Sequence, residues 1–433
     1  MTRFNKNTDS EDFVKALASK IVCSVELKFD DICEKRTKDV LINLEKVLNS
    51  FSKEGLGAHH FSSLTGYAHN DLGRELIDRV YANIFGCEKA AVRMQFVSGT
   101  HAITCALFGV LRPSDSLLSI TGKPYDTLEE VIGLRGSGKG SLLEFGIKYD
   151  QLNIFDNGEI NLPLLDKALD TSIDMIFIQR SCGYSWRPSL SINSIKDICN
   201  LIHAKQPDCI CFVDNCYGEF VEPLEPTDVG ADLIAGSLIK NPGGTIVPSG
   251  GYIAGRKDLV EKSCCRLTAP GIGSQGGSGF DLNRIVLQGL FLAPQMVSES
   301  LIGAELIAGV FNYLGFEVKP LPGMHRSDLI QGVQIGDSEI LKVICRAFQN
   351  SSPVGSFLNP IPSSTPGYEM ELIMAGGTFI DGSTSEFSAD APLKPPYNLF
   401  VQGGTHRSHV KIAIIRALVA LHQTGFIDLS QKI

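Results

Sequence analysis

The chain has 433 residues, of which 43% are hydrophobic and 20% charged, and its formal net charge is -9. This length is enough to bury a substantial core, and the acidity disfavours broad binding to the phosphate backbone of DNA or RNA. A local basic site for one small anionic ligand stays open.

The N-terminal part of the chain has a helical pattern. Residues 10–55 are rich in helix formers with apolar residues spaced by three and four, which predicts one or two amphipathic helices in an N-terminal arm over residues 1–55. From about residue 56, short apolar runs alternate with helical segments. We expect strands at 92–97, 116–120, 175–179, 209–213 and 251–254, and helices at 73–84, 100–111, 127–134 and 194–204.

A Gly-rich stretch within 255–280 and a long helical pattern at about 281–314 follow. They predict a large domain over residues 56–310 and a smaller C-terminal α/β domain over 311–433. Short strands separated by helices indicate βαβ units and a mainly parallel sheet, so the expected fold class is α/β. Ligands of such sheets bind in the loops after the carboxyl ends of the strands. Residues that carry chemistry are therefore expected directly after strands.

Two features lie at expected strand ends. Ser98, Gly99 and Thr100 follow the run VRMQFV and open a helix, where free N–H groups and two hydroxyls can hold a phosphate. Ordinary helix capping explains the same residues. Asp214 ends the run CICFVD, where an acid can pair with a pyridinium nitrogen or serve only as a cap or salt-bridge partner.

Two further features complete the set. Lys240 lies between an apolar segment and Asn-Pro-Gly-Gly, and burial there would free its amine for imine formation. A lysine in a turn is more often a surface charge, but a βα unit's length of chain separates it from Asp214. Ser237 could reach the same phosphate. Tyr125, after the run SLLSI, could stack on a flat cofactor or simply pack in the core.

The order of these features matches fold-type I pyridoxal-phosphate (PLP) enzymes. The sequence resembles one branch of them, the methionine gamma-lyase-like proteins also called aluminium resistance proteins, which are related to the cystathionine gamma-synthase and lyase group. The resemblance covers nearly all of residues 25–425. It is carried by GYAHNDLGRELIDRVYANIFGCEKA, VSGTHAI, GKPYDTLEEVIG, FVDNCYGEF, AGSLIKNPGGTIVPSGGYIAG and GGTHRSHVKIAI.

The resemblance implies a large domain with a mainly parallel seven-stranded sheet, a smaller C-terminal domain and a role for each residue. Lys240 matches the catalytic lysine that binds PLP as a Schiff base, Asp214 the partner of the pyridinium nitrogen, and Tyr125 the stacking aromatic. The phosphate cup is matched by Ser98, Gly99, Thr100 and Ser237.

Arg407 aligns with the arginine that binds the substrate carboxylate, although a solvated basic turn with His406 and His409 is the alternative. Tyr67 resembles a tyrosine that related enzymes contribute to a neighbouring subunit's phosphate site. An aromatic and acidic stretch is expected after that tyrosine, but this chain has Ala-His-Asn at 68–70. The resemblance also implies a homodimer or homotetramer with shared sites.

The implied reaction is β- or γ-elimination from a sulfur-containing amino acid, with Lys240 as the base for the α-proton and a thiol, a keto acid and ammonia as products. The rivals are γ-replacement (transsulfuration) or transamination, and a non-catalytic PLP-binding protein of stress or metal resistance. A nucleotide-binding P-loop is set aside, since GSGKGS at 136–141 lacks the required spacing.

The cysteines predict a cytoplasmic protein with reduced thiols. All twelve lack a C-x-x-C pairing, and most lie in apolar surroundings. Cys209 and Cys211 would share one face of a strand, but no matching Cys or His pair is near them in sequence, so no metal site is predicted. The N-terminus has no apolar secretory segment, and no uninterrupted apolar run reaches the ~20 residues of a membrane span.

Overall fold

A seven-stranded sheet is the centre of the larger part of this protein, in a computed structural model that describes residues 10–156, 158–365, 368 and 370–432. Residues 1–9, where no secretory segment is expected, lie outside this range. The chain divides into two compact units: a large unit, Leu41–Gly183 with Arg187–Pro294, and a small unit, Met1–Val40, Tyr184–Trp186 and Gln295–Ile433. This division differs from the three-part organisation expected over 1–55, 56–310 and 311–433.

The sheet of the large unit has the strand order β1-β9-β8-β7-β6-β2-β3. Five strands, from β8 to β3, run parallel, whereas β9 is antiparallel to both β8 and β1. The mainly parallel seven-stranded α/β fold is therefore confirmed. The bounds are Lys89–Arg93 (β1), Ser116–Ser119 (β2), Lys148–Gln151 (β3), Met175–Gln179 (β6), Ile210–Asp214 (β7), Leu233–Ser237 (β8) and Gly251–Gly255 (β9), with a small hairpin of Phe155–Asp156 (β4) and Glu159–Ile160 (β5).

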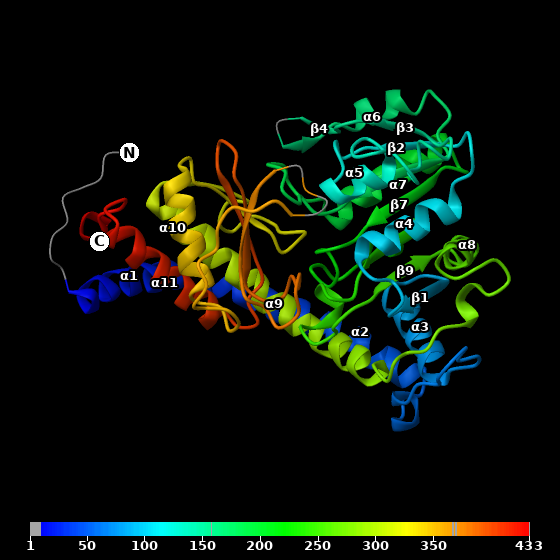
Figure 1. Ribbon diagram of the computed structural model, residues 1–433, viewed down its shortest axis with the longest axis horizontal. Coiled ribbons are helices and arrows are strands. Elements are labelled where there is room, and N and C mark those ends of the chain that lie inside the picture. Colours follow the sequence, from blue (N-terminus) through cyan, green and yellow to red (C-terminus); the bar gives the residue numbers. More distant parts are fainter. Residues whose placement is uncertain (1–9, 157, 366–367, 369, 433) are drawn as a thin grey trace. The chain divides into compact units, whose positions relative to one another are not determined.

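Helices cover both faces of this sheet (Figure 1). The apolar sides of α4 and α8 bury Phe177, Phe212 and Ile253 from the strands in one core. This explains why the runs of β6 and β7 are apolar on successive residues, since strands covered on both faces have no polar side. The helices are Leu72–Ile84 (α3), Gly99–Val110 (α4), Asp126–Ile132 (α5), Leu162–Ala168 (α6), Ile192–Lys205 (α7) and Lys257–Leu267 (α8).

The expected strands agree with the bounds of β2, β6, β7 and β9. The strand expected at 92–97 is wrong in position, because β1 ends at Arg93. Arg93 pairs with Gly251, the first residue of β9, so β9 offers no partner for residues 94–97. The strands β3 and β8 were not expected as separate elements. The β3 sequence, KYDQ, is polar, and the β8 sequence, LIAGS, contains a glycine and a single β-branched residue.

The small unit contains a five-stranded antiparallel sheet of order β10-β11-β14-β13-β12. One apolar core joins it to α1, α10, α11 and the second part of α9. The strands are Glu317–Lys319 (β10), Gln331–Gln334 (β11), Leu372–Ala375 (β12), Ser388–Pro392 (β13) and Asn398–Gln402 (β14). The helices are Glu11–Glu26 (α1), Asp30–Lys53 (α2), Asn283–Leu314 (α9), Ser338–Gln349 (α10) and Arg407–Gln423 (α11), with α2 and α9 each crossing the division between units.

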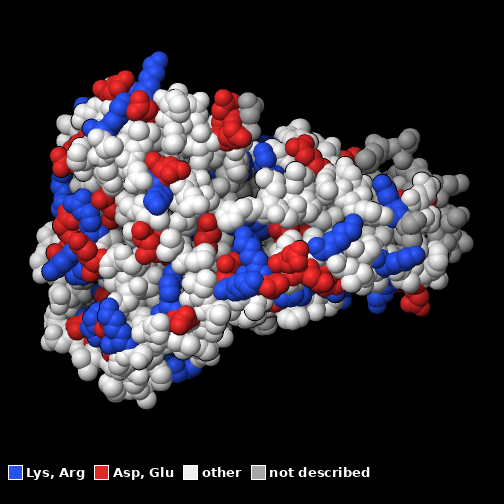
Figure 2. Space-filling model, turned by 180° about the vertical axis from the view of Figure 1, so that it is seen from behind, with Lys and Arg blue, Asp and Glu red and all other residues white. Residues whose placement is uncertain are grey.

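Helix α9 is long and apolar enough to cross a membrane by composition alone, but 67% of its most apolar window is buried within the protein. A core helix passes the same test, and the burial of α9 is that of a core helix. On the face drawn in Figure 2, acidic and basic side chains of the described residues are interspersed among neutral ones, without a broad area of either sign.

Candidate active site

The ends of β7 and β8 bring three of the expected residues to one edge of the sheet. Asp214 is the last residue of β7 and Ser237 the last of β8, and these neighbouring strands are parallel. Lys240 follows three residues later, and its N–H lies 3.4 Å from the carbonyl oxygen of Ser237. The carboxyl ends of parallel strands lie at one edge of the sheet. Residues that end neighbouring strands are therefore close in space although they are distant in the sequence.

The start of α4 packs against this edge. Ser98 is the N-cap residue of α4, and its hydroxyl accepts from the N–H of His101 at 3.1 Å. A Cβ atom at Gly99 would lie 3.1 Å from Ser237 Cβ and 3.3 Å from Cys216 Sγ. Only a glycine gives this approach without displacing neighbours. The Gly99 turn therefore packs directly against Ser237, and the phosphate cup expected of residues 98–100 and Ser237 stays a prediction.

Tyr125 contacts the expected cup through its hydroxyl, which donates to Thr100 Oγ1 at 3.2 Å. Its backbone N–H donates to the side chain of Gln179, the last residue of β6, at 3.2 Å. Burial and the nearby Asp214 carboxylate raise the pKa of Tyr125 well above its ordinary value, so the ring carries a neutral hydroxyl. The tyrosine is thus fixed beside both the α4 turn and the strand-end acid.

Asp214 is buried, with 5% of its surface exposed. Burial raises its pKa to about 6, while the N–H of Cys216, at 3.1 Å, and the charge of Lys240 oppose the rise. The protein alone therefore compensates the negative charge of this buried carboxylate poorly. A cationic partner would restore the stability of its charged form.

Lys240 is half-buried, and its Nζ lies 4.0 Å from the ring centroid of Tyr217. Tyr217 has a φ angle of 72°, a left-handed conformation that a bulky residue rarely adopts. This backbone turns the ring toward the lysine. The amine is therefore not the solvated surface charge that a lysine in a turn usually is, and the aromatic face stabilises its cationic form.

A buried arginine fixes the turn that follows Asp214. Arg180 is 0% exposed and donates to the Asn215 side chain at 2.8 Å and to Glu222 at 2.9 Å. Asn215 in turn donates to Glu225 at 3.0 Å. A Cβ at Gly218 would lie 2.5 Å from the arginine side chain, so the glycine lets the turn close over it. This network sets the direction in which the residues after Asp214 leave the strand.

A second buried acid, Glu219, lies in the same segment. Its Oε1 accepts from the Tyr252 hydroxyl at 2.7 Å, and its backbone carbonyl accepts from the side chain of Asn241 at 2.9 Å. Burial raises the pKa of Glu219 to about 8, so it carries a proton at neutral pH. Glu219 Oε2 and Tyr81 Oη have no hydrogen-bond partner within the described part of the chain. Glu219 thus holds the residue directly after Lys240.

The Asn-Pro-Gly-Gly sequence after Lys240 lets this loop touch α9. Residues Asn241–Gly243 form a short 3-10 turn, and Gly244 has a φ angle of 53°. A Cβ at Gly244 would lie 2.3 Å from the carbonyl oxygen of Gly289, and one at Gly289 would lie 2.4 Å from that of Gly243. Both positions therefore require glycine, and the contact anchors the Lys240 loop on the first part of α9.

One observation of the protein itself supports the fit of these residues to PLP. The Ser237 hydroxyl is buried and has no hydrogen-bond partner among the described residues, although it faces the Gly99 turn. A phosphate at the N-terminus of α4 would accept from this hydroxyl and from the free N–H groups of the helix. Asp214 would supply the anionic partner for a pyridine nitrogen, and Lys240 would supply an amine for the aldehyde.

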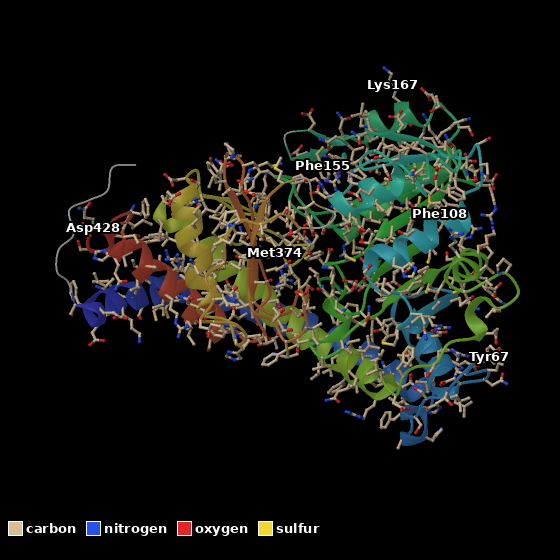
Figure 3. The ribbon with its side chains drawn as sticks, in the orientation of Figure 1. Tyr67, Phe108, Phe155, Lys167, Met374 and Asp428 are labelled. Atoms are coloured by element: carbon tan, nitrogen blue, oxygen red, sulfur yellow. The ribbon has the colours of Figure 1, made fainter. Side chains whose placement is uncertain are left out.

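Two further residues are expected in the site, Tyr67 and Arg407. Tyr67 is 81% exposed, stacks on His69 at 5.6 Å, and its side chain points away from the large unit in Figure 3. Arg407 begins α11 in the small unit, where its guanidinium binds Glu299 at 2.6 and 3.1 Å. Because Glu299 already accepts from two nitrogens of the guanidinium, a substrate carboxylate would compete with Glu299 for them. The roles expected for both residues stay predictions.

Sequence reasoning assigned no role to Cys216, Tyr217 or Glu219. All three lie in the segment FVDNCYGEF, where only Asp214 was singled out. The sequence does contain one signal for this segment, which is a glutamate, Glu219, among apolar residues shortly after a buried strand. A charged residue there has to be buried with a partner, and the partner Tyr252 lies more than thirty positions further along the chain.

Comparison with known proteins shows the family to which this chain is related. The sequence matches the methionine gamma-lyase family over residues 18–422. The uncharacterized protein YnbB of Bacillus subtilis is 47% identical over 383 residues, 88% of this chain and 91% of YnbB. The crystal structure of a carbon-sulfur lyase involved in aluminum resistance from Clostridium novyi is 44% identical, with a TM-score of 0.89 over 96% of this chain and 99% of that chain.

The PLP-dependent protein YhfS of Escherichia coli shares the fold at 16% identity, with a TM-score of 0.59 over 97% of this chain and 99% of that chain. The likeness to YhfS concerns the fold alone, which is that of fold-type I PLP enzymes. Since the family match spans most of the chain, the resemblance inferred from the motifs is confirmed, and this chain belongs to the methionine gamma-lyase family, in its aluminium-resistance branch.

Proposed function

We propose that this chain is a PLP-dependent lyase that breaks the carbon–sulfur bond of a sulfur-containing amino acid by β- or γ-elimination. The observation that carries the proposal is the meeting of Asp214, Ser237 and Lys240 with the Gly99 turn at one edge of the sheet. The carbon-sulfur lyase of Clostridium novyi, 44% identical over nearly its whole length, supports the same class of reaction.

In this proposal each residue has a distinct task. The cup of Ser98, Gly99, Thr100 and Ser237 holds the phosphate, Asp214 keeps the pyridine nitrogen protonated, and Tyr125 lines the ring. When bound, PLP supplies the electron sink that stabilises negative charge at the substrate Cα. Lys240 Nζ would hold the cofactor through its amine and would accept the Cα proton of the substrate.

The bond changes define the products. The Cα–H and C–S bonds break, the sulfur leaves as a thiol with one proton, and water is consumed as the remaining fragment becomes a 2-oxo acid and ammonia. Lys240 Nζ is the group that can return a proton to the leaving sulfur or to the side chain. The ring of Tyr217, 4.0 Å from Nζ, stabilises the ammonium form that Lys240 takes after each proton transfer.

A panel of substrates tests the proposal. Purified protein is titrated with methionine, homocysteine, cystathionine and cysteine while the cofactor absorbance near ~420 nm and 2-oxo acid release are recorded. Release of a thiol and a 2-oxo acid in equal amounts without any thiol acceptor is expected. A product that forms only when an acceptor thiol is added would assign γ-replacement instead, and cofactor binding without turnover on any substrate would overturn the lyase proposal.

We further propose that two or four copies share their sites, in the cytoplasm. An apolar side chain is exposed beside the cup, since Val97, which directly precedes Ser98, is 76% exposed. Large apolar side chains left exposed next to a binding site favour burial by a partner surface. None of the twelve cysteines, all of which lie in the described part of the chain, forms a disulfide, which supports a reducing compartment.

A further inference from the structure

A second group of potential ligand side chains lies at the other end of β7 from Asp214. Cys211 is the second residue of β7, Cys199 and His203 lie one helical turn apart on α7, and Asp232 directly precedes β8. In the sequence, Cys209 is the only cysteine close to Cys211, and no matching Cys or His pair lies near them. The fold supplies partners for Cys211 from two other elements.

Three of these side chains converge. A ring nitrogen of His203, Cys211 Sγ and a carboxylate oxygen of Asp232 all lie within 4.8 Å of one another. Asp232 Oδ2 is 3.0 Å from His203 Nε2. The Cys199 thiol is hydrogen-bonded to the Cys211 thiol but lies outside this group of three. Both cysteines are 0% exposed, whereas His203 is 32% exposed and gives access from solvent.

The surrounding contacts hold the aspartate in place. The backbone N–H of Cys211 donates to Asp232 Oδ2 at 2.8 Å, and Arg256 lies 3.4 Å from Asp232 Oδ1. A ligand carboxylate is oriented by bonds of this kind. One thiolate, one carboxylate, one neutral imidazole and a divalent cation have no net charge. The site therefore requires no further counter-ion.

We propose that His203, Cys211 and Asp232 bind one divalent cation of borderline softness, of which Zn²⁺ is the type. One sulfur, one imidazole nitrogen and one carboxylate oxygen are donors that zinc takes, and the fourth tetrahedral position is left to water. The site ties α7 to β7 and to the start of β8. Binding displaces the proton of the Cys211 thiol, so one proton is released per cation. This proposal is independent of the proposed lyase activity.

The test measures zinc in the full-length protein. The protein is prepared under reducing conditions, stripped with a chelator, dialysed against Zn²⁺ and analysed by mass spectrometry of its metal content. About one zinc per chain is expected in the wild type, with a higher unfolding temperature than in the stripped protein. Cys211→Ser and His203→Gln are each expected to lose the zinc, whereas Cys105→Ser, a buried cysteine on α4, is expected to keep it.

His203→Gln keeps the test valid if the buried Cys211→Ser variant fails to fold, because His203 is partly exposed. A wild type that retains no zinc after dialysis overturns the proposal. Zinc retained equally by the wild type and all variants also overturns it, since the ion then binds elsewhere. A Cys199–Cys211 disulfide that forms in preference to zinc binding in the reduced and metal-supplied protein would equally contradict the site.

Discussion

Replacing Glu219 with glutamine tests how the buried acid behind Lys240 is held. Burial is the main cause that raises the pKa of Glu219 from 4.5 to about 8, while the Tyr252 hydroxyl opposes the rise. Between these two values the folded chain keeps a proton that the unfolded chain has lost. The stability contributed by this proton is therefore complete below about pH 4.5 and is lost as the pH rises toward 8.

The magnitude follows from the size of the pKa change. At ~1.4 kcal/mol for each tenfold change in proton affinity, a rise from 4.5 to about 8 corresponds to about 5 kcal/mol, of which roughly 3.5 kcal/mol falls between pH 5 and pH 8. Glutamine has the shape of the protonated acid, and its amide oxygen can accept from Tyr252. We therefore expect Glu219→Gln to match the wild type near pH 5 and to be more stable by a few kcal/mol at pH 8.

Urea unfolding followed by far-ultraviolet circular dichroism measures this difference. The protein concentration is kept the same at every pH, because subunit dissociation changes the apparent stability. Glu45→Gln, at an exposed position of α2 in the same unit, is the matched control and is expected to follow the wild type. Stability curves of the wild type and Glu219→Gln that stay parallel from pH 5 to pH 8 would refute the reasoning.

Four further predictions concern the site. Lys240→Ala is expected to lose the cofactor absorbance and all 2-oxo acid release in the assays above, whereas Lys262→Ala, at an exposed position of α8, keeps both. Because the pKa of Asp214 is raised to about 6, PLP binding by the cofactor-free protein should weaken as the pH falls from 7 to 5, and Asp214→Asn should bind weakly at every pH, which a spectroscopic titration measures. Gly99→Ala, whose Cβ would lie 3.1 Å from Ser237, is expected to lower the affinity for PLP and to cost about 1–3 kcal/mol of stability, and unchanged values for both would count against the cup. Arg407→Lys separates two roles of Arg407. A lower unfolding temperature with unchanged KM would assign the arginine to its pair with Glu299. A KM raised about tenfold or more at an unchanged unfolding temperature would assign it to the substrate carboxylate.

Much of the fold could be predicted because its signals are local. The runs of β2, β6 and β7 are short, apolar and flanked by helical patterns, so their existence and type follow from periodicity alone. The position of β1 could not be predicted, since residues 94–97 are as apolar as the strand before them. Only the pairing of β1 with β9 ends the strand at Arg93.

The candidate site was predictable to the extent that strand ends determine it. Asp214 and Ser237 end neighbouring parallel strands, and Lys240 follows within three residues, so the sheet alone brings them together. Glu219 and Tyr217 were not predictable, because their importance depends on a partner distant in sequence and on a left-handed backbone. Arg407 is the opposite case, because the sequence singles it out for the site. Its guanidinium binds Glu299, more than a hundred positions earlier, and this pair is visible only in the structure.

The sequence by itself determined the α/β class, the mainly parallel sheet and the order of a phosphate turn, a strand-end acid and a lysine. These depend on patterns within a few residues of each position, and the side-chain periodicity of strands and helices is fixed by their backbone geometry. The tertiary structure decided which groups are buried and what they face. It placed the Gly99 turn against Ser237, raised the pKa of Asp214 and Glu219, and gave Cys211 its partners on α7. Burial and contact between distant segments arise only when the chain packs, so they set the chemistry of residues whose identity the sequence already contains.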